Sequence, residues 1–433
     1  MSSKALSSKA LSSKALSSKA LSSKALSSKA LSSKALSSKA LSSKSPKTAL
    51  SDFDRLMAEA IEAQRIPGVT AALASSDEIL WQGAFGERSL GSGESMAIDT
   101  VMSIMSMTKP VAGAAAMLAV ERGLLDLDAP AKALIPFLGE VQVLDGFDPS
   151  GSPLLRPPRT DITLRNLMTH TAGFVYDIWN ADAARYEAFL ASTSGATVGG
   201  TYDWIKKPLA FDPGERWEYS VSIDWVGLLV EAATGSTLGA FLAEEFFEPL
   251  GMHDTGFGLS DQWLQRGAAL HVRDGKGGYN VNPMVARDTE FDSGGGGLFS
   301  TATDYVRFMQ MVLNGGELDG NRVLSGNSVD LMATNSMGDL RVSMLPTQNP
   351  GLSNDAELMP GIGKSWGLTF QINEDPVPGG RSAGSLSWAG MFNTYFWIDR
   401  AKDLAGVQLT QVLPFADTET VALFEEFERL AYR

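Results

Sequence analysis

Hydrophobic positions along this chain follow a helical spacing first and strand-like runs next. Apolar residues recur every three to four positions over 53–61, which predicts a helix that ends before Pro67. Two β-rich runs, 69–74 and 78–85, follow and are separated by a short polar turn, an arrangement that predicts a β-hairpin. A continuous apolar run over 111–120 then predicts a buried helix.

The middle of the chain has a mainly helical pattern, and its end returns to strands. The C-terminal runs are short, apolar or alternating, and bounded by turn residues, which favours strands over helices. Helices are predicted over 161–169, 183–190, 223–233, 238–247 and 303–313, strands over 367–372, 385–388, 394–399 and 404–411, and a closing amphipathic helix over 421–430.

Strands at both ends of the chain, with helices between them, predict a fold of the α/β (α+β) class. We expect a central antiparallel sheet built from both termini, flanked by helices, and an inserted, mainly helical lobe that forms a cleft against it. The α/β part is expected at about 48–110 and 290–433, and the helical lobe at about 111–289. The domain over 48–433 is long enough to bury sizeable cores.

The first 47 residues differ from the rest in composition. Ser-Ser-Lys-Ala-Leu repeats eight times from Ser2 to Leu41, without acidic or aromatic residues. A five-residue period rotates successive leucines by about 140° around a helix, so no apolar stripe forms. We interpret residues 1–47 as a low-complexity leader that is disordered or was added to the natural chain.

Composition argues against several classes of function. Without the ten lysines of the leader, 26 basic residues remain against 50 acidic ones, a balance that disfavours nucleic acid binding. The chain has no cysteine, only three histidines and no His-Glu-x-x-His, so neither a metal site nor a cofactor is predicted. No apolar run has the length of a membrane span. The absence of a visible signal peptide favours the cytoplasm, although the leader leaves a periplasmic or secreted location open.

The sequence holds one Ser-x-x-Lys, formed by Ser106 and Lys109, immediately before the apolar helix. Two side chains three residues apart share a helix face, so the amine can reach the hydroxyl and help to remove its proton. The positive potential of the helix N-terminus would favour the alkoxide and the oxyanion that follows. Ser106 is therefore a candidate nucleophile, and the alternative is a helix N-cap followed by a solvated lysine.

Other polar residues complement or compete with this pair. Tyr219, in a turn leading into a helix, is the best second proton-handling group, and a lowered pKa would let its tyrosinate act as a base. His170 is better explained by hydrogen bonding at a helix end. Ser382 lies in a Gly-x-Ser-x-Gly match, but a strand follows it and no histidine comes later, so a nucleophile elbow is not expected. The glycine loop 292–297 lacks the Gly-Lys of a P-loop and is expected to pack closely beside a site.

Several motifs recur together over about residues 50–433. They are Ser106-x-x-Lys109, Pro213-Gly-x-x-Trp-x-Tyr219-Ser, Ser387-Trp388-Ala389-Gly390, Leu167-Met-Thr-His-Thr-Ala-Gly173, Pro249-Leu-Gly-Met-His-Asp-Thr-Gly-Phe257 and Gly296-Gly-Leu-Phe-Ser-Thr-Ala-Thr-Asp304. This set resembles the serine β-lactamase and penicillin-binding superfamily. It is most similar to the family VIII carboxylesterases, which are related to class C β-lactamases.

The resemblance implies a role for each matched residue. Ser106 would be the nucleophile, and Lys109 and Tyr219 would form the acid/base pair. The oxyanion hole would consist of the backbone N–H groups of Ser106 and Met391. Composition adds an apolar pocket for a short acyl chain. The predicted substrate-binding residues are Trp388, Ala389, Gly390, Tyr176 and Phe392.

Two departures from the lactam-hydrolysing relatives bear on the substrate. Those relatives carry Lys-Thr-Gly where Trp388-Ala389-Gly390 stands, and Val221 replaces the amide of their Tyr-x-Asn motif, so anionic β-lactams should bind poorly. Family VIII esterases carry Trp-Gly-Gly at the first of these positions. The sequence thus predicts a serine carboxylesterase that hydrolyses short-chain, small-molecule esters through an acyl-enzyme, without a cofactor. The alternatives are an acyltransferase, a D-aminopeptidase or amide hydrolase, a weak β-lactamase, and an inactive ligand-binding relative; no oligomeric state is indicated.

Overall fold

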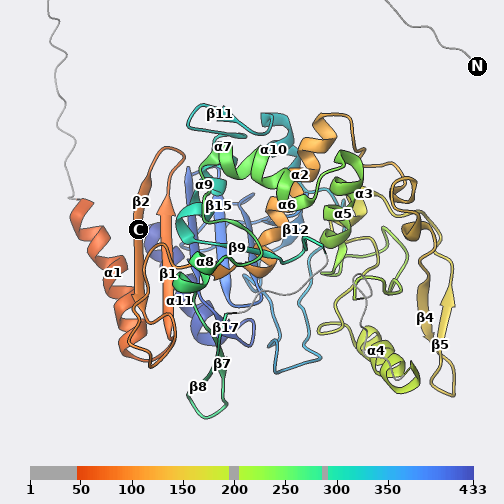
Figure 1. Ribbon diagram of the computed structural model, residues 1–433, viewed down its shortest axis with the longest axis horizontal. Helices are drawn as coiled ribbons and strands as arrows, with labels where there is room; N and C mark the ends of the chain where they lie inside the picture. Colours follow the sequence, from red (N-terminus) through yellow and green to blue (C-terminus); the bar gives the residue numbers. More distant parts are fainter. Residues whose placement is uncertain (1–45, 195–203, 285–290) are drawn as a thin grey trace, which may run out of the picture. The chain divides into compact units, whose positions relative to one another are not determined.

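Strands from both ends of the chain form one antiparallel sheet in the computed structural model, which describes residues 46–194, 204–284 and 291–433 (Figure 1). Its strands are β1 (Gly68–Ala74), β2 (Ile79–Gly86), β12 (Lys364–Trp366), β13 (Gln371–Asn373), β14 (Leu386–Gly390), β15 (Thr394–Asp399) and β16 (Leu404–Leu409). They lie in the order β12-β13-β14-β15-β16-β1-β2, so the N-terminal β1 pairs with the C-terminal β16. The predicted sheet built from both termini is confirmed, and the repeats of the leader lie outside the described residues.

The described residues form eleven α-helices, of which some cover the two faces of this sheet and others lie in the rest of the fold. They are α1 (Pro46–Glu62), α2 (Thr108–Glu121), α3 (Leu164–Met168), α4 (Ala181–Ser194), α5 (Ser222–Thr234), α6 (Leu238–Leu242), α7 (Glu248–Leu250), α8 (Asp261–Arg266), α9 (Ala302–Leu313), α10 (Gly326–Met332) and α11 (Thr418–Ala431), with a π-helical turn, Ala243–Phe247, between α6 and α7.

Adjacent residues of β15 point to opposite faces of the sheet, as strand geometry requires. The ring of Trp397 lies 5.3 Å from that of Phe427 on α11, and α11 also contacts α1. The ring of Phe396 instead lies 5.3 Å from that of Tyr305 on α9. The face covered by α9 is the one on which α2 and its preceding turn are held, because the Tyr305 hydroxyl donates to the backbone carbonyl of Met107.

Smaller sheets form outside the central sheet. The structure places here two hairpins that the helical pattern did not predict, and in Figure 1 the β4–β5 hairpin stands beside α4. Their strands are short and partly exposed, so they lack the apolar alternation from which strands are predicted. The additional strands are β3 (Met102–Ser103), β4 (Val143–Phe147), β5 (Pro153–Arg156), β6 (Gly256–Phe257), β7 (Leu270–Arg273), β8 (Tyr279–Asn282), β9 (Leu298–Ser300), β10 (Glu317–Leu318), β11 (Asn321–Arg322) and β17 (Val412–Leu413).

The strand predicted over 367–372 is wrong, because most of this segment is the turn of the β12–β13 hairpin. Its apolar residues are buried even though they form a turn. The turn packs under α2, where a Cβ added at Gly113 would meet the Thr369 side chain at 2.2 Å. Thr369 itself adopts a φ of 81°, which no strand residue has.

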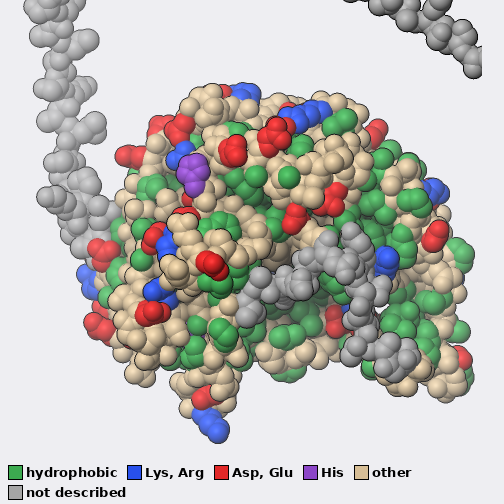
Figure 2. Space-filling view, in the orientation of Figure 1, with side chains coloured by type: hydrophobic (Ala, Val, Ile, Leu, Met, Phe, Trp, Pro, Cys, Tyr) green, Lys and Arg blue, Asp and Glu red, His purple; other side chains and the backbone are tan. Residues whose placement is uncertain are grey.

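The surface carries charges of both signs. On the face shown in Figure 2, Asp and Glu side chains are spread among Lys and Arg side chains over the described residues. Within the described part of the chain, no single helix has the length and apolar character to cross a membrane, and one bent pair, Ser222–Thr234 with Leu238–Leu250, meets that test by length and composition only.

Candidate active site

Ser106 lies in a short 3-10 turn, Met105–Met107, that leads directly into α2. The strand before it, β3, pairs with β9, and the backbone N–H of Ile104 donates to the carbonyl of Leu298. These contacts tie the turn to the chain that follows the glycine loop. Met105 has a φ of 48°, in the left-handed region that a non-glycine residue rarely adopts, so the turn is locally strained. Strain of this kind is common beside catalytic residues.

Lys109 is fully buried in the first turn of α2, and its amine is held by three oxygens. Its Nζ lies 3.2 Å from Ser106 Oγ, 3.1 Å from Tyr176 Oη and 2.7 Å from the carbonyl oxygen of Gly295. The spacing of three residues predicted the first contact. The other two come from segments far away in the sequence.

Burial decides the charge of Lys109. Removing the ammonium from water lowers the pKa of Lys109 to about 7, while the negative charge of Asp224 acts in the opposite direction. At neutral pH a large share of the amine is therefore unprotonated. A neutral amine 3.2 Å from the Ser106 hydroxyl can accept its proton, which is what a serine nucleophile requires.

Tyr219 lies just before α5 and is also buried. Its hydroxyl is hydrogen-bonded with the Ser106 side chain and accepts a 3.0 Å hydrogen bond from Trp388 Nε1. The Lys109 Nζ lies 4.7 Å from the centre of the Tyr219 ring. Ser106, Lys109 and Tyr219 are thus brought together, as predicted from their motifs.

The lowered pKa that would let Tyr219 act as a base is not found. Burial raises the pKa of Tyr219 far above its ordinary value, and the hydrogen bonds from its neighbours do not offset this. The phenol therefore stays protonated at neutral pH, and a tyrosinate base is not available. Lys109 is the base that this centre offers, and Tyr219 is suited to donate or relay a proton.

Sequence reasoning missed Asp224, which is fully buried in the first turn of α5. Its Oδ1 accepts hydrogen bonds from the Ser293 hydroxyl at 2.6 Å and from the backbone N–H of Gly295 at 3.0 Å. The loop 292–297 therefore packs beside the site, as its glycines suggested. No signal in the sequence distinguished Asp224 from other acidic residues near helix starts, which are common.

The contacts of His170 and Ser382 are those of structural residues. His170 Nδ1 is 2.9 Å from Ser220 Oγ, its Nε2 has no hydrogen-bond partner among the described residues, and burial, with the charge of Lys109, lowers the pKa of His170 well below its ordinary value. The backbone N–H of Ser382 donates to Asp399 Oδ2 at 2.7 Å in the loop before β14. A strand follows Ser382, so this serine does not sit on a strand-to-helix elbow.

Strand β14 carries three of the predicted substrate-binding residues, and all of them are buried. The Trp388 ring lies 4.6 Å from that of Trp366, edge to face, and its N–H points to Tyr219. A Cβ at Gly390 would lie 2.3 Å from the carbonyl oxygen of Ile104, so this strand end packs against the backbone that leads to Ser106. Met391 follows directly, and its N–H together with that of Ser106 stays the predicted oxyanion hole.

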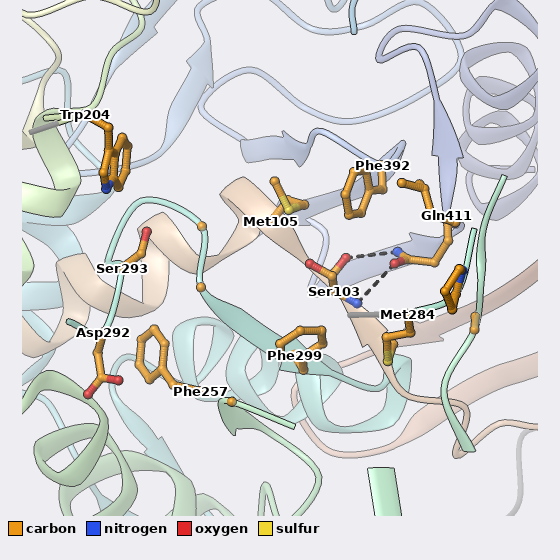
Figure 3. Close-up of a pocket in the computed structure, with 16 residues that line it drawn as sticks. Ser103, Met105, Trp204, Phe257, Met284, Asp292, Ser293, Phe299, Phe392 and Gln411 are labelled. Atoms are coloured by element: carbon orange, nitrogen blue, oxygen red, sulfur yellow. Dashed lines mark hydrogen bonds between the residues drawn. The ribbon is translucent and has the colours of Figure 1, made fainter. Parts of the chain in front are cut away.

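A cavity of about 550 Å³ adjoins this centre (Figure 3). Met105 and Gly296, which line it, are chain neighbours of Ser106 and Gly295. Of the predicted substrate-binding residues, Phe392 lines this cavity, whereas Tyr176, Trp388, Ala389 and Gly390 do not. Its other apolar side chains include Trp204, Phe257, Met284 and Phe299.

One polar pair closes an edge of the cavity. Gln411 accepts a hydrogen bond from the backbone N–H of Ser103 at 3.2 Å and donates to the Ser103 carbonyl at 2.9 Å, as the dashed lines in Figure 3 mark. Among the described residues, no group of three or more His, Asp or Glu side chains is placed to hold a metal ion. The cavity is therefore lined by both apolar and polar groups, and two of the polar residues, Ser103 and Gln411, are bonded to each other.

Comparisons with known proteins extend over nearly the whole folded region. A family model described as Beta-lactamase matches residues 53–428. Lovastatin esterase of Penicillium rubens is 30% identical over 397 residues, covering 88% of this chain and 98% of that protein. Monacolin J acid methylbutanoyltransferase of Aspergillus terreus is 30% identical over 390 residues, covering 86% of this chain and 93% of that protein.

A solved structure gives the same picture. Unliganded simvastatin synthase (LovD) from Aspergillus terreus, as its selenomethionyl derivative, superposes with a TM-score of 0.77 and 28% identity. The alignment covers 89% of this chain and 98% of that one. The similar proteins thus include both an esterase and acyl-transferring enzymes.

Proposed function

Because this chain belongs to the Beta-lactamase family, in which its relatives include esterases and acyltransferases, we propose that it is a serine carboxylesterase acting on small-molecule esters. One observation carries the proposal: the buried amine of Lys109, with a pKa of about 7, lies 3.2 Å from Ser106 Oγ. This contact supplies the neutral base that a serine nucleophile needs.

The proposed reaction has two halves. Ser106 Oγ attacks the ester carbonyl carbon while Lys109 accepts the hydroxyl proton. The ester C–O bond then breaks, Tyr219 gives its proton to the departing alkoxide, and Lys109 passes its proton to the Tyr219 oxygen. Water attacks the acyl-enzyme in the same way, and its proton returns to Ser106 through Lys109. The backbone N–H groups of Ser106 and Met391 would hold the oxyanion, each contributing on the order of 3 kcal/mol.

The cavity guides the proposal for the substrate. Its volume of about 550 Å³ lies within the range of small-molecule sites, and the aromatic and methionine side chains in its lining would contact an apolar group. We therefore propose a short acyl chain on Ser106, with a larger apolar portion of the ester in the cavity. At positions 388 and 389, tryptophan and alanine offer neither the charge nor the hydroxyl that holds a lactam carboxylate, which disfavours β-lactams.

An acyltransferase is the second candidate, and it uses the same three residues. It is favoured by the similarity to a protein named methylbutanoyltransferase and by the 28% identity with simvastatin synthase over most of the chain. In this case an alcohol in the apolar cavity, rather than water, would attack the acyl-enzyme. The difference between the two candidates is the acceptor alone.

The test is hydrolysis of p-nitrophenyl butyrate by the parent protein, Ser106→Ala and Ser382→Ala, with nitrocefin run alongside. We expect only Ser106→Ala to lose activity and nitrocefin to stay intact. Adding a bulky alcohol separates the two candidates, because an acyltransferase forms the new ester at the expense of butyrate. Loss in Ser382→Ala alone would overturn the assignment. A parent protein that does not react with a covalent serine probe would favour the inactive relative.

A further inference from the structure

Asp224 is a buried carboxylate to which the proposed mechanism assigns no step. It lies in the first turn of α5, where the helix dipole favours negative charge. Two hydrogen-bond donors to this carboxylate, the Ser293 hydroxyl and the Gly295 N–H, belong to the glycine loop. A carboxylate with two short contacts to one loop anchors that loop, because charge-assisted hydrogen bonds are stronger than neutral ones.

The anchored loop reaches the catalytic lysine through a single residue. Gly295 is bonded to Asp224 through its N–H and to Lys109 Nζ through its carbonyl, at 3.0 Å and 2.7 Å. A Cβ at Gly295 would lie 2.3 Å from Asp224 Oδ2. Only glycine therefore allows the backbone to pack this closely against the carboxylate.

The charges around Lys109 give Asp224 a second effect. The titratable groups that face the amine are Tyr176, Tyr219, His170 and Asp224. Burial keeps Tyr219 and His170 neutral at pH 7. Asp224 is the carboxylate whose charge acts on the amine and favours its protonated form.

On the basis of the proposed serine mechanism, we propose that Asp224 is a positioning residue that holds the Gly295 carbonyl against Lys109 and supplies the negative charge facing the amine. It does not touch the substrate. It acts through Lys109 in two ways that separate experimentally: hydrogen bonds that place Nζ beside Ser106, and a charge that sets the pH at which Nζ becomes a base.

Asp224→Asn separates the two effects, because it keeps the size and an acceptor oxygen and removes the charge. Without the carboxylate the ammonium of Lys109 is less favoured, so the acidic limb of kcat/KM should move about one pH unit to lower pH. A carboxylate needed only for folding would lower the melting temperature and the activity without moving this limb. Asp182→Asn, which removes an exposed first-turn carboxylate from α4, is the matched control and should leave the limb in place.

Ser293→Ala tests the anchoring by itself, since it removes one hydrogen bond and keeps the charge. We expect kcat to fall about fivefold, while the acidic limb of the kcat/KM pH profile stays at the same pH. If Asp224→Asn does not fold, this variant decides: a folded Ser293→Ala with parental kcat overturns the anchoring role.

Failure of this inference is distinct from failure of the proposed function. A parent protein that neither hydrolyses the ester nor transfers its acyl group, or a fully active Ser106→Ala, refutes the serine mechanism, and the role of Asp224 falls with it. The role of Asp224 alone is refuted if activity depends on Ser106 but a folded Asp224→Asn has the same acidic limb of the kcat/KM pH profile as the parent protein.

Discussion

The indole N–H of Trp388 donates a 3.0 Å hydrogen bond to the hydroxyl oxygen of Tyr219. An indole nitrogen can only donate, so the phenol must direct its own proton elsewhere. Its other hydrogen-bonding neighbour is the Ser106 side chain. The Tyr219 proton is therefore available to an acceptor other than Trp388. Trp388, which the sequence predicts to line a substrate pocket, thus holds the hydroxyl of Tyr219 at the candidate catalytic centre.

Trp388→Phe should lower kcat about fivefold with little change in KM. The substitution removes a hydrogen bond worth about 1 kcal/mol and leaves an aromatic ring in place. Trp366→Phe is a close control, because Trp366 is buried against Trp388 and its Nε1 has no partner among the described residues. Equal losses in the two variants would show that packing, not the hydrogen bond, matters here. Steady-state kinetics with one ester decides between them.

The activity should fall on the acidic side of about pH 7. The pKa of Lys109 is about 7, and below this pH the amine is protonated and cannot accept the Ser106 proton. The raised pKa of Tyr219 predicts no loss from tyrosine ionisation up to about pH 10. A pH profile of kcat/KM measures the limb in the free enzyme. A profile that stays flat from about pH 5 to about pH 9 would contradict Lys109 as the base.

Lys109 should also make the fold less stable near neutral pH than at higher pH. Its pKa is 10.5 in the unfolded chain and about 7 in the folded one, so between these values the unfolded chain binds more protons. The free energy of unfolding then rises with pH across this window. Lys109→Met lacks this contribution, so its stability relative to the parent protein should decrease as the pH rises from about 7 to about 10, by on the order of a few kcal/mol.

Urea denaturation at several pH values within that window measures this difference. Lys402→Met, which removes an exposed lysine from the turn after β15, is the control. A relative stability of Lys109→Met that does not change with pH would mean that the buried amine is not destabilising the fold.

Local patterns in the sequence predicted most of the helices and strands, and within the site they predicted the contact between Ser106 and Lys109. Ser106 and Lys109 are three residues apart, about one helix turn, and the strands of the sheet are apolar runs. Both features are local in the sequence and can be predicted from it alone. Contacts across long sequence separations cannot. The bond from Lys109 to Gly295 joins residues 186 positions apart, and that from Trp388 to Tyr219 joins residues 169 apart.

The protonation states followed from burial, which the sequence does not give. Tyr219 beside a lysine suggested a lowered pKa, but desolvation of the phenol outweighs its neighbours. The turn at 367–370 was missed for a related reason: its apolar residues are buried as in a strand, but they are buried beneath α2. In both cases the environment outweighed the local pattern.

Phe299→Ala should shift the preference of the enzyme toward bulkier esters. Phe299 lies on β9 and lines the cavity beside Ser106, so its removal enlarges the apolar space without touching the polar centre (Figure 3). Each methylene buried there contributes about 0.8 kcal/mol, so kcat/KM for octyl butyrate relative to butyl butyrate should rise about tenfold or more. Trp388→Phe should lower kcat/KM for both substrates by a similar factor, because the ring of Trp388 does not line the cavity. An unchanged octyl-to-butyl ratio in a folded Phe299→Ala would mean that the alcohol portion of these esters does not occupy the cavity.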